Sequence, residues 1–284
     1  MNEQVAQLAT INSGAFSLRE VGKIYDPTGA RVVALDNCSV DIHANEFVAL
    51  VGPSGCGKST LMNIMAGFDD LTSGAMYLDD VPLSTVERPA KPGPDRVVVF
   101  QHGALFPWMT VLDNVTYGLI RQGRMKKKEA AEYAYQFLDK AGGLNKVAEY
   151  FPGQISSGMQ RRVEFIRALI NDPKILLLDE PFRAMDTVTQ ARMHRYLLQM
   201  YQVFPKTIMF VTHDIDEAIL LSDTVVVMTT RPGKIKLSAK VDLPRPRTPD
   251  MITSKEFLVL KKELLTAVHE EAKKAFERGE RELA

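Results

Sequence analysis

Nine residues near the start of the chain match a phosphate-binding pattern. Residues 52–60 read GPSGCGKST and fit GxxxxGK[ST], with the apolar run FVALV before them and a helical apolar spacing after them. Glycines let successive backbone N–H groups turn around a polyphosphate, and the N-terminus of the next helix adds donors. The flanking strand and helix favour a nucleotide site over an ordinary glycine-rich turn. The candidate ligands are Gly52, Pro53, Ser54, Gly55, Cys56, Gly57, Lys58, Ser59 and Thr60.

Three side chains of this loop supply different chemistry. The Lys58 ammonium would reach the β- and γ-phosphates as a point charge, and the Ser59 hydroxyl would ligate Mg²⁺. Thr60 would be a further phosphate contact. The loop therefore predicts that a nucleotide polyphosphate binds together with Mg²⁺.

Polar side chains also follow three later apolar runs. Asp179 and Glu180 come after ILLL, Gln101 after VVVF, and His213 after TIMFVT. Because ligands of open α/β sheets bind beyond the carboxyl ends of the strands, we expect these side chains at one edge. Adjacent carboxylates can divide the work, one facing Mg²⁺ and the other a water molecule. Taken singly, Gln101 proves little and a lone histidine is usually structural.

Two further candidates also have simpler structural interpretations. Ser156 is a natural N-cap for a helix over residues 157–170, and a serine with Gly158 at a helix N-terminus could bind an anion. On this segment alone an ordinary capped helix is the favoured interpretation. Tyr25 ends a strand just before a turn, where its ring could stack on a base, but taken alone simple packing is the favoured interpretation.

The apolar patterns predict the elements that must position these residues. Strands alternate with helices, which predicts a mostly parallel sheet, preceded by a small antiparallel layer. The predicted strands are residues 16–25, 32–42, 47–51, 74–78, 97–100, 175–178, 207–212 and 224–228. The predicted helices are residues 58–67, about 125–141, 157–170, 215–221 and 255–278.

Composition restricts the classes of function. Lys+Arg and Asp+Glu both total 35, and this balance argues against a protein that mainly holds a nucleic-acid backbone. The only cysteines, Cys38 and Cys56, are too few for a disulfide framework and fit a reducing compartment. The chain has no apolar run near ~18 residues and no signal-peptide pattern at its start. We therefore expect a protein that neither crosses a membrane nor is secreted.

An aromatic segment could be a docking surface. Residues 102–119 include Phe106, Trp108, Met109 and Val111 in a loop-like setting. Such a cluster is typical of a partner interface, and simple coverage of the core is an equal alternative.

With these pieces in order, the sequence resembles the ATP-binding subunit of an ABC transporter from about residue 16 to residue 228. Residues 52–59 match the Walker A loop, and the resemblance implies an ABC ATPase fold of the P-loop NTPase class, with a helical subdomain and a C-terminal helical tail. The other matches are Gln101 with the Q-loop, Ser156 and Gly158 with the signature motif, Asp179 and Glu180 with Walker B, Asp186 with the D-loop, His213 with the switch histidine and Tyr25 with the adenine-stacking aromatic.

The resemblance also implies how the chain is divided and where it works. It predicts a polar lead-in over residues 1–15, an ATPase domain over 16–240 with its helical subdomain at about 102–172, and a linker and helix over 241–284. Segments GPDRVVVFQHGALFPWMTVLDNV and VDLPRPR look most like importers of nitrate, sulfonate, taurine or bicarbonate. In that family two ATPase copies, identical or paralogous, dock beneath two membrane permease subunits at the cytoplasmic face of the inner membrane, and an external binding protein delivers the solute.

Three positions depart from the family pattern. The signature is usually LSGG, whereas this chain has Ser157 in place of the first glycine. The usual FGALD carries Arg183 and Met185 here. Both sites are expected at the dimer seam, so these departures bear on hydrolysis rate and dimer affinity.

The resemblance implies a mechanism in which two copies enclose two ATPs, each bound by Walker A of one copy and by Ser156, Ser157 and Gly158 of the other. Glu180 polarises water, His213 contacts the γ-phosphate, and Lys58 offsets charge on the phosphates. Ser59, Gln101 and Asp179 ligate Mg²⁺, so Gln101 also belongs to the catalytic residues.

Two other classes remain as alternatives. The first motif alone would allow a P-loop GTPase or kinase. A GTPase should show an NKxD-type motif, and NKVA at residues 145–148 lacks the aspartate. A non-transport ABC ATPase would act as a nucleotide-driven clamp on DNA or ribosomes, but such proteins usually carry two cassettes or a long coiled coil. Co-purification with an integral membrane protein, as against nucleic acid or ribosomes, discriminates between them.

Overall fold

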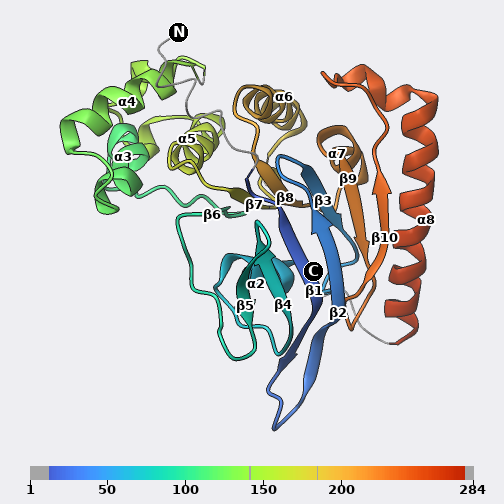
Figure 1. Cartoon of the computed structure of the whole chain (residues 1–284). Coiled ribbons are helices and arrows are strands. Elements are labelled where there is room, and N and C mark those ends of the chain that lie inside the picture. Colours follow the sequence, from blue (N-terminus) through green and yellow to red (C-terminus); the bar gives the residue numbers. More distant parts are fainter. Residues whose placement is uncertain (1–12, 141, 184, 279–284) are drawn as a thin grey trace.

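The central element of the structure is a six-stranded sheet (Figure 1). The computed structural model describes residues 13–140, 142–183 and 185–278. In the order β10-β9-β3-β8-β7-β6, all neighbours are parallel except β10, which is antiparallel to β9. The mostly parallel sheet predicted from the sequence is thus confirmed. Its strands are β3 (Phe47–Val51), β6 (Arg96–Val99), β7 (Ile175–Asp179), β8 (Thr207–Val211), β9 (Thr224–Met228) and β10 (Ile235–Lys240).

Both faces of this sheet are covered, which explains why its central strands β3, β7 and β8 are almost entirely apolar. In β3, Phe47 and Ala49 belong to one buried cluster, whereas Val48 and Leu50 belong to another. Successive side chains of a strand point to opposite faces, so a strand covered on both sides needs an apolar residue at every position. One cluster includes side chains from the helices between α3 (Val111–Arg121) and α8 (Lys255–Glu277), and the other joins the sheet to α2 (Lys58–Ala66) and the N-terminal strands.

The N-terminal strands form a second, antiparallel sheet in the order β2-β1-β4-β5. Its members are β1 (Phe16–Tyr25), β2 (Val32–Ile42), β4 (Ser73–Leu78) and β5 (Val81–Thr85). The antiparallel layer is confirmed, but β5 is not among the predicted strands. Pro82 hides the strand pattern there, and β5 tolerates a proline because it lies at the edge of its sheet.

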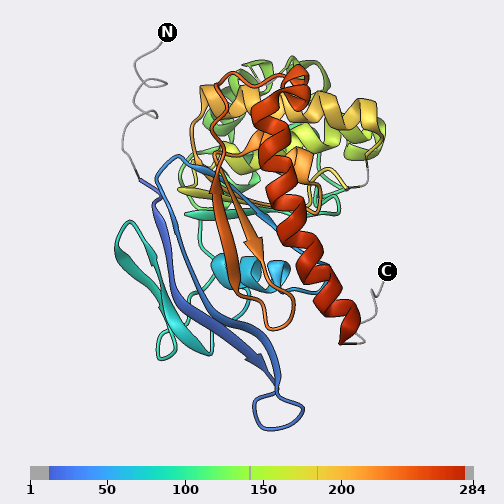
Figure 2. The same ribbon diagram turned by 90° about the vertical axis from the view of Figure 1, so that its right-hand side faces the viewer.

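Helices α3 to α8 lie on one side of the core sheet, and α2 lies on its other side (Figures 1 and 2). Figure 1 shows α3, α4 and α5 gathered beyond β6, and α8 lying along β9 and β10 at the opposite end. Helix α2 lies between the two sheets. The helices are α2 (Lys58–Ala66), α3 (Val111–Arg121), α4 (Lys127–Lys140), α5 (Ser157–Leu169), α6 (Thr187–Val203), α7 (Ile215–Leu221) and α8 (Lys255–Glu277), with 3-10 turns at Leu144–Val147, Pro152–Gln154 and Pro249–Thr253.

The aromatic segment differs from its prediction as a loop. Phe106, Trp108 and Met109 precede helix α3, but Val111 is the first residue of that helix. Thr110 caps it by accepting a hydrogen bond from the Asp113 N–H at 3.1 Å. Residues 111, 115 and 119 are fully buried on one face, a helical spacing that the β-branched residues and a glycine obscure. Helix α6 and strand β10 are likewise absent from the predicted elements.

The C-terminal part of the chain packs against the core sheet. Phe257 and Leu264 of α8 are fully buried. Arg247, in the segment predicted as a linker, is also buried, and its Nη1 donates to the Ile219 carbonyl at 3.1 Å. Burial lowers the pKa of Arg247 to about 10. Residues 1–12 of the predicted lead-in and Ala141 lie outside the described residues. In the described part of the chain, every helix is too short or too polar to cross a bilayer.

Candidate nucleotide site

The predicted phosphate loop connects β3 to α2 in the expected strand-loop-helix order. Gly57, the N-cap of α2, has φ +102°, and a Cβ there would lie 2.8 Å from a Leu35 methyl group. No side chain caps this helix, and its first turn carries no acidic residue. Its N–H groups and the positive end of its dipole therefore remain available to an anion. Lys58 is 8% exposed, and its Nζ donates to the Gly52 carbonyl at 2.8 Å.

The acidic pair follows β7, as the sequence predicts. Asp179 is the last residue of the strand, and Glu180 takes a left-handed backbone conformation with φ +39°. Burial and the neighbouring Glu180 raise the pKa of Asp179, while the charge of Lys58 lowers it. Because β3, β8 and β7 are successive parallel strands, the phosphate loop after β3 and the carboxylates after β7 lie at the same edge of the sheet.

His213 and Glu180 meet although they follow different strands. Nδ1 of His213 lies 3.3 Å from Oε2 of Glu180, and the His213 side chain is 60% exposed. Behind them, the buried Glu217 accepts from the Thr212 hydroxyl at 2.5 Å and contacts His194 at 2.6 Å. A buried carboxylate therefore holds the residue before His213 in place.

Two departures from the family pattern also have defined positions. Nη1 of Arg183 lies 3.2 Å from Oε2 of Glu180, on an arginine side chain that is 57% exposed. An arginine thus stands beside the candidate catalytic carboxylate, where the usual motif has a glycine. Met185 packs against the apolar core, a volume-conserving replacement for the usual leucine.

A buried ion pair that the sequence analysis missed holds the segment that carries Gln101. Arg161 and Glu164 of α5 lie 2.6 Å apart and are less than a tenth exposed. Arg161 donates to the carbonyls of Phe100 at 2.8 Å and Gln101 at 2.7 Å, and Glu164 accepts from the Ala104 N–H at 2.6 Å. The available signal was an arginine and a glutamate at i, i+3 on the apolar face of a helix.

We expect Arg161→Ala to destabilise the protein by about 3–5 kcal/mol, because it leaves a buried carboxylate unpaired. Arg162→Ala is the matched control. Arg162 lies over the Tyr196 ring at 5.3 Å in a cation–π geometry, which is worth about 0.5–1 kcal/mol. Urea unfolding of both variants measures the difference. Equal losses would show that the ion pair does not anchor the Gln101 segment.

Tyr25 and the helix capped by Ser156 lie outside this cluster. Ser156 caps α5 by accepting from the Met159 N–H at 3.3 Å, which confirms the predicted N-cap, and Ser156 and Ser157 are exposed. The Tyr25 hydroxyl donates to Asp69 at 2.7 Å and lies 3.5 Å from the Thr60 hydroxyl of α2. The structure thus brings Lys58, Asp179, Glu180 and His213 together at one edge, with Tyr25 beside α2.

Comparison with known sequences agrees with this geometry. The family described as ABC transporter matches residues 35–183. An uncharacterised ABC transporter ATP-binding protein of Methanocaldococcus jannaschii is 47% identical over 89% of this chain and 91% of its own. The nitrate import ATP-binding protein NrtD of Synechocystis is 42% identical over 80% of this chain and 82% of its own. The bicarbonate transport ATP-binding protein CmpC of Synechococcus elongatus is 40% identical over 84% of this chain and 35% of its own.

A solved structure shows the same fold. It is the dimeric, post-hydrolysis state of the ATP-binding cassette MJ0796 bound to ADP and Pi, which is 31% identical with a TM-score of 0.65. The similarity covers 81% of this chain and all of that one. The family match covers the phosphate loop and the acidic pair, and two of the relatives are more than 40% identical over most of the chain. This chain therefore belongs to the ABC transporter family and is one of its ATP-binding, ATP-hydrolysing proteins.

Proposed function

We propose that this chain powers the import of a small solute, an anion such as nitrate, sulfonate, taurine or bicarbonate, by hydrolysing ATP beneath a membrane permease. The observation that carries the ATPase assignment is the meeting of Lys58, Asp179, Glu180 and His213 at the carboxyl edge of the sheet. The named activities of the nitrate and bicarbonate relatives support the choice of an anion.

Each polar group at the edge has a role in phosphoryl transfer. The Lys58 ammonium offsets charge on the phosphates, Glu180 polarises the attacking water, and His213 contacts the γ-phosphate. The exposed ring of Tyr25 offers a stacking face for adenine beside α2. These roles use groups that point to the same edge from three different strands.

The residues also fit a magnesium ion. Ser59, Gln101 and Asp179 offer a hydroxyl, an amide and a carboxylate oxygen, the hard donors that Mg²⁺ prefers. Burial and the adjacent Glu180 raise the pKa of Asp179, and a bound cation would favour its ionised form. When bound, Mg²⁺ would neutralise charge on the β- and γ-phosphates.

Hydrolysis is proposed to need two copies of the chain. The N-terminus of α5 is exposed at its N-cap Ser156 and at Ser157. In a dimer, this helix end would bind the ATP held by the partner's phosphate loop. The dimeric cassette MJ0796 supports this arrangement.

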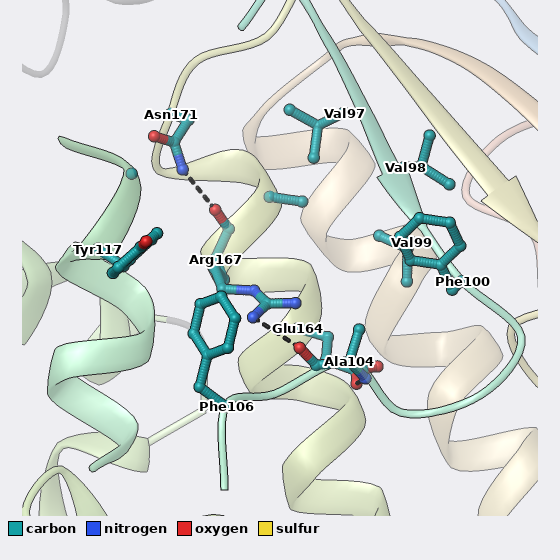
Figure 3. Close-up of a pocket in the computed structure, with 12 residues that line it drawn as sticks. Val97, Val98, Val99, Phe100, Ala104, Phe106, Tyr117, Glu164, Arg167 and Asn171 are labelled. Atoms are coloured by element: carbon teal, nitrogen blue, oxygen red, sulfur yellow. Dashed lines mark hydrogen bonds between the residues drawn. The ribbon is translucent and has the colours of Figure 1, made fainter. Parts of the chain in front are cut away.

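The permease is proposed to dock beside the aromatic segment, where a cavity of about 400 Å³ separates β6 from α3 and α5 (Figure 3). Phe106 lies at its rim, with ring centroids 5.6 Å from Trp108 and 5.0 Å from Tyr117. The Arg167 guanidinium lies 5.4 Å from the Phe106 ring. Trp108 is 70% exposed, so it does not simply cover the core, and a membrane-protein helix would bury it.

We expect the double variant Phe106→Ala/Trp108→Ala to weaken attachment to the permease by at least tenfold with only a modest loss of thermal stability, because the Trp108 ring is exposed and Phe106 is half-buried beside it. Pull-down with the permease and thermal unfolding measure the two effects. Phe276→Ala, which removes an 83% exposed ring from α8, is the control and should keep permease binding. Loss of stability with intact permease binding would favour the core-packing alternative.

The proposed function as a whole is tested in proteoliposomes that contain this chain, its permease and its solute-binding protein. One of the four anions should stimulate ATP hydrolysis, and its uptake into the vesicles should depend on that hydrolysis. Co-purification with nucleic acid or ribosomes, and no integral membrane partner, would contradict the proposal and favour the clamp alternative.

A further inference from the structure

The connection between β9 and β10 touches the phosphate loop from outside the nucleotide site. Nε of Arg231 donates to the Gly55 carbonyl at 3.1 Å. Gly233 packs so closely that a Cβ there would lie 2.2 Å from the Cys56 carbonyl oxygen. Gly55 has φ +74°, a left-handed backbone conformation that glycine adopts readily. The phosphate loop therefore depends on a glycine at the point that Arg231 contacts. The neighbouring Arg231 and Gly233 therefore restrict a segment whose own sequence is flexible.

The connection is itself fixed to the antiparallel sheet. The Gly233 N–H donates to the Ala34 carbonyl at 2.9 Å, and the Gly233 carbonyl accepts from the Asp36 N–H at 2.9 Å. The Cys38 thiol also donates to the Gly233 carbonyl at 3.2 Å. These contacts hold the backbone of Gly233 against β2. The connection therefore has a fixed position from which Arg231 can restrain the phosphate loop.

Helix α8 holds the other side of the connection (Figure 2). The Thr230 N–H donates to Oε2 of Glu271 at 3.1 Å, and Nη1 of Arg278 donates to the Arg231 carbonyl at 2.6 Å. Lys236 and Lys274 bind the other oxygen of Glu271 at 2.8 and 2.7 Å. Burial opposes the charge of Glu271, but these hydrogen bonds lower its pKa to about 2. The contact therefore stays ionised across the physiological range.

We propose that Arg231 is a positioning residue for ATP binding, through which helix α8 holds the phosphate loop in its nucleotide-binding conformation. The inference rests on the proposed assignment of residues 52–60 to the ATP phosphates. Arg231 does not need to touch the nucleotide: it fixes the Gly55 carbonyl, and with it the direction of the neighbouring N–H groups. Its role is thus in affinity for ATP and not in the chemical step.

The test compares two cations of the same connection. We expect Arg231→Ala to raise the Kd of a fluorescent ATP analogue and the KM for ATP about tenfold, with kcat within twofold of wild type. Lys234→Ala is the matched control, because Lys234 pairs with Asp36 at 2.6 Å on β2 and not with the phosphate loop. It should change Kd less than twofold. Equal effects of the two variants, or a loss confined to kcat, would overturn the proposal.

The contribution of α8 is tested with Arg278→Ala, which lies at the end of the helix and leaves its buried face intact. This variant should raise Kd about threefold, and the double variant Arg231→Ala/Arg278→Ala should be no worse than Arg231→Ala, because both act through one contact. An unchanged Kd in Arg278→Ala, or additive losses, would show that α8 does not act through Arg231. Lys58→Ala separates the two hypotheses: if it retains full ATP affinity, the nucleotide site itself is misassigned.

Discussion

Glu180→Gln is expected to leave ATP binding intact and to reduce ATP turnover by at least tenfold. The amide keeps the shape of the carboxylate and can still contact His213 and Arg183, which lie 3.3 and 3.2 Å from it. It cannot accept a proton or polarise water equally, so the loss falls on the chemical step. The nucleotide-bound dimer should accumulate as a consequence.

Steady-state ATPase and nucleotide binding measure this prediction together. Glu149→Gln is a suitable control, because Glu149 hydrogen-bonds the Tyr135 hydroxyl at 2.6 Å in the helical part of the molecule, away from the sheet edge. Turnover above about a tenth of wild type in Glu180→Gln corresponds to a barrier change below ~1.4 kcal/mol and would remove Glu180 from the proposed role.

Ser157→Asp should reduce ATPase in the assembled transporter by more than tenfold. Ser157 is the first residue of α5 and is exposed, so the substitution creates no clash within the chain. A carboxylate at a helix N-terminus interacts favourably with the helix dipole, by about 0.3–1 kcal/mol, so the fold should be retained. Loss of activity would therefore report repulsion between this carboxylate and the phosphates bound by the partner copy.

Two substitutions at the same position complete the test. Ser157→Asn is the neutral control of matched size, and Ser157→Gly restores the family's usual residue. We expect glycine to change ATPase by less than tenfold, within ~1.4 kcal/mol, because serine fits a helix start and its hydroxyl can donate to a phosphate oxygen. Full activity of the aspartate variant would mean that α5 does not face nucleotide and that the proposed dimer is wrong.

The sequence alone determined the elements whose signals are local. The strand before the phosphate loop, the loop and α2 lie within twenty residues, and each has its own apolar period or glycine spacing. The run that ends in Asp179 and the N-cap Ser156 are equally local features. Their predicted bounds agree with the structure because neighbouring residues decide them.

Elements that depend on distant partners were harder to predict. Strand β5 contains Pro82, which obscures its strand pattern. It forms because it pairs with β4, and it tolerates the proline because it lies at the edge of the sheet. Helix α3 contains Gly118 and β-branched residues of modest helix propensity, and the burial of Val111, Val115 and Leu119 stabilises it. Packing overrides local preference in both cases.

The tertiary structure alone decided how the site is held. Glu180 and His213 follow different strands and meet because β7 and β8 are parallel neighbours, while Arg161 reaches a carbonyl 60 residues away. Arg231 contacts Gly55 across 176 residues of sequence. A single sequence records the residue types needed for chemistry, because catalysis constrains them directly. It does not record which distant backbone carbonyls an arginine will bind, because that depends on how the chain packs.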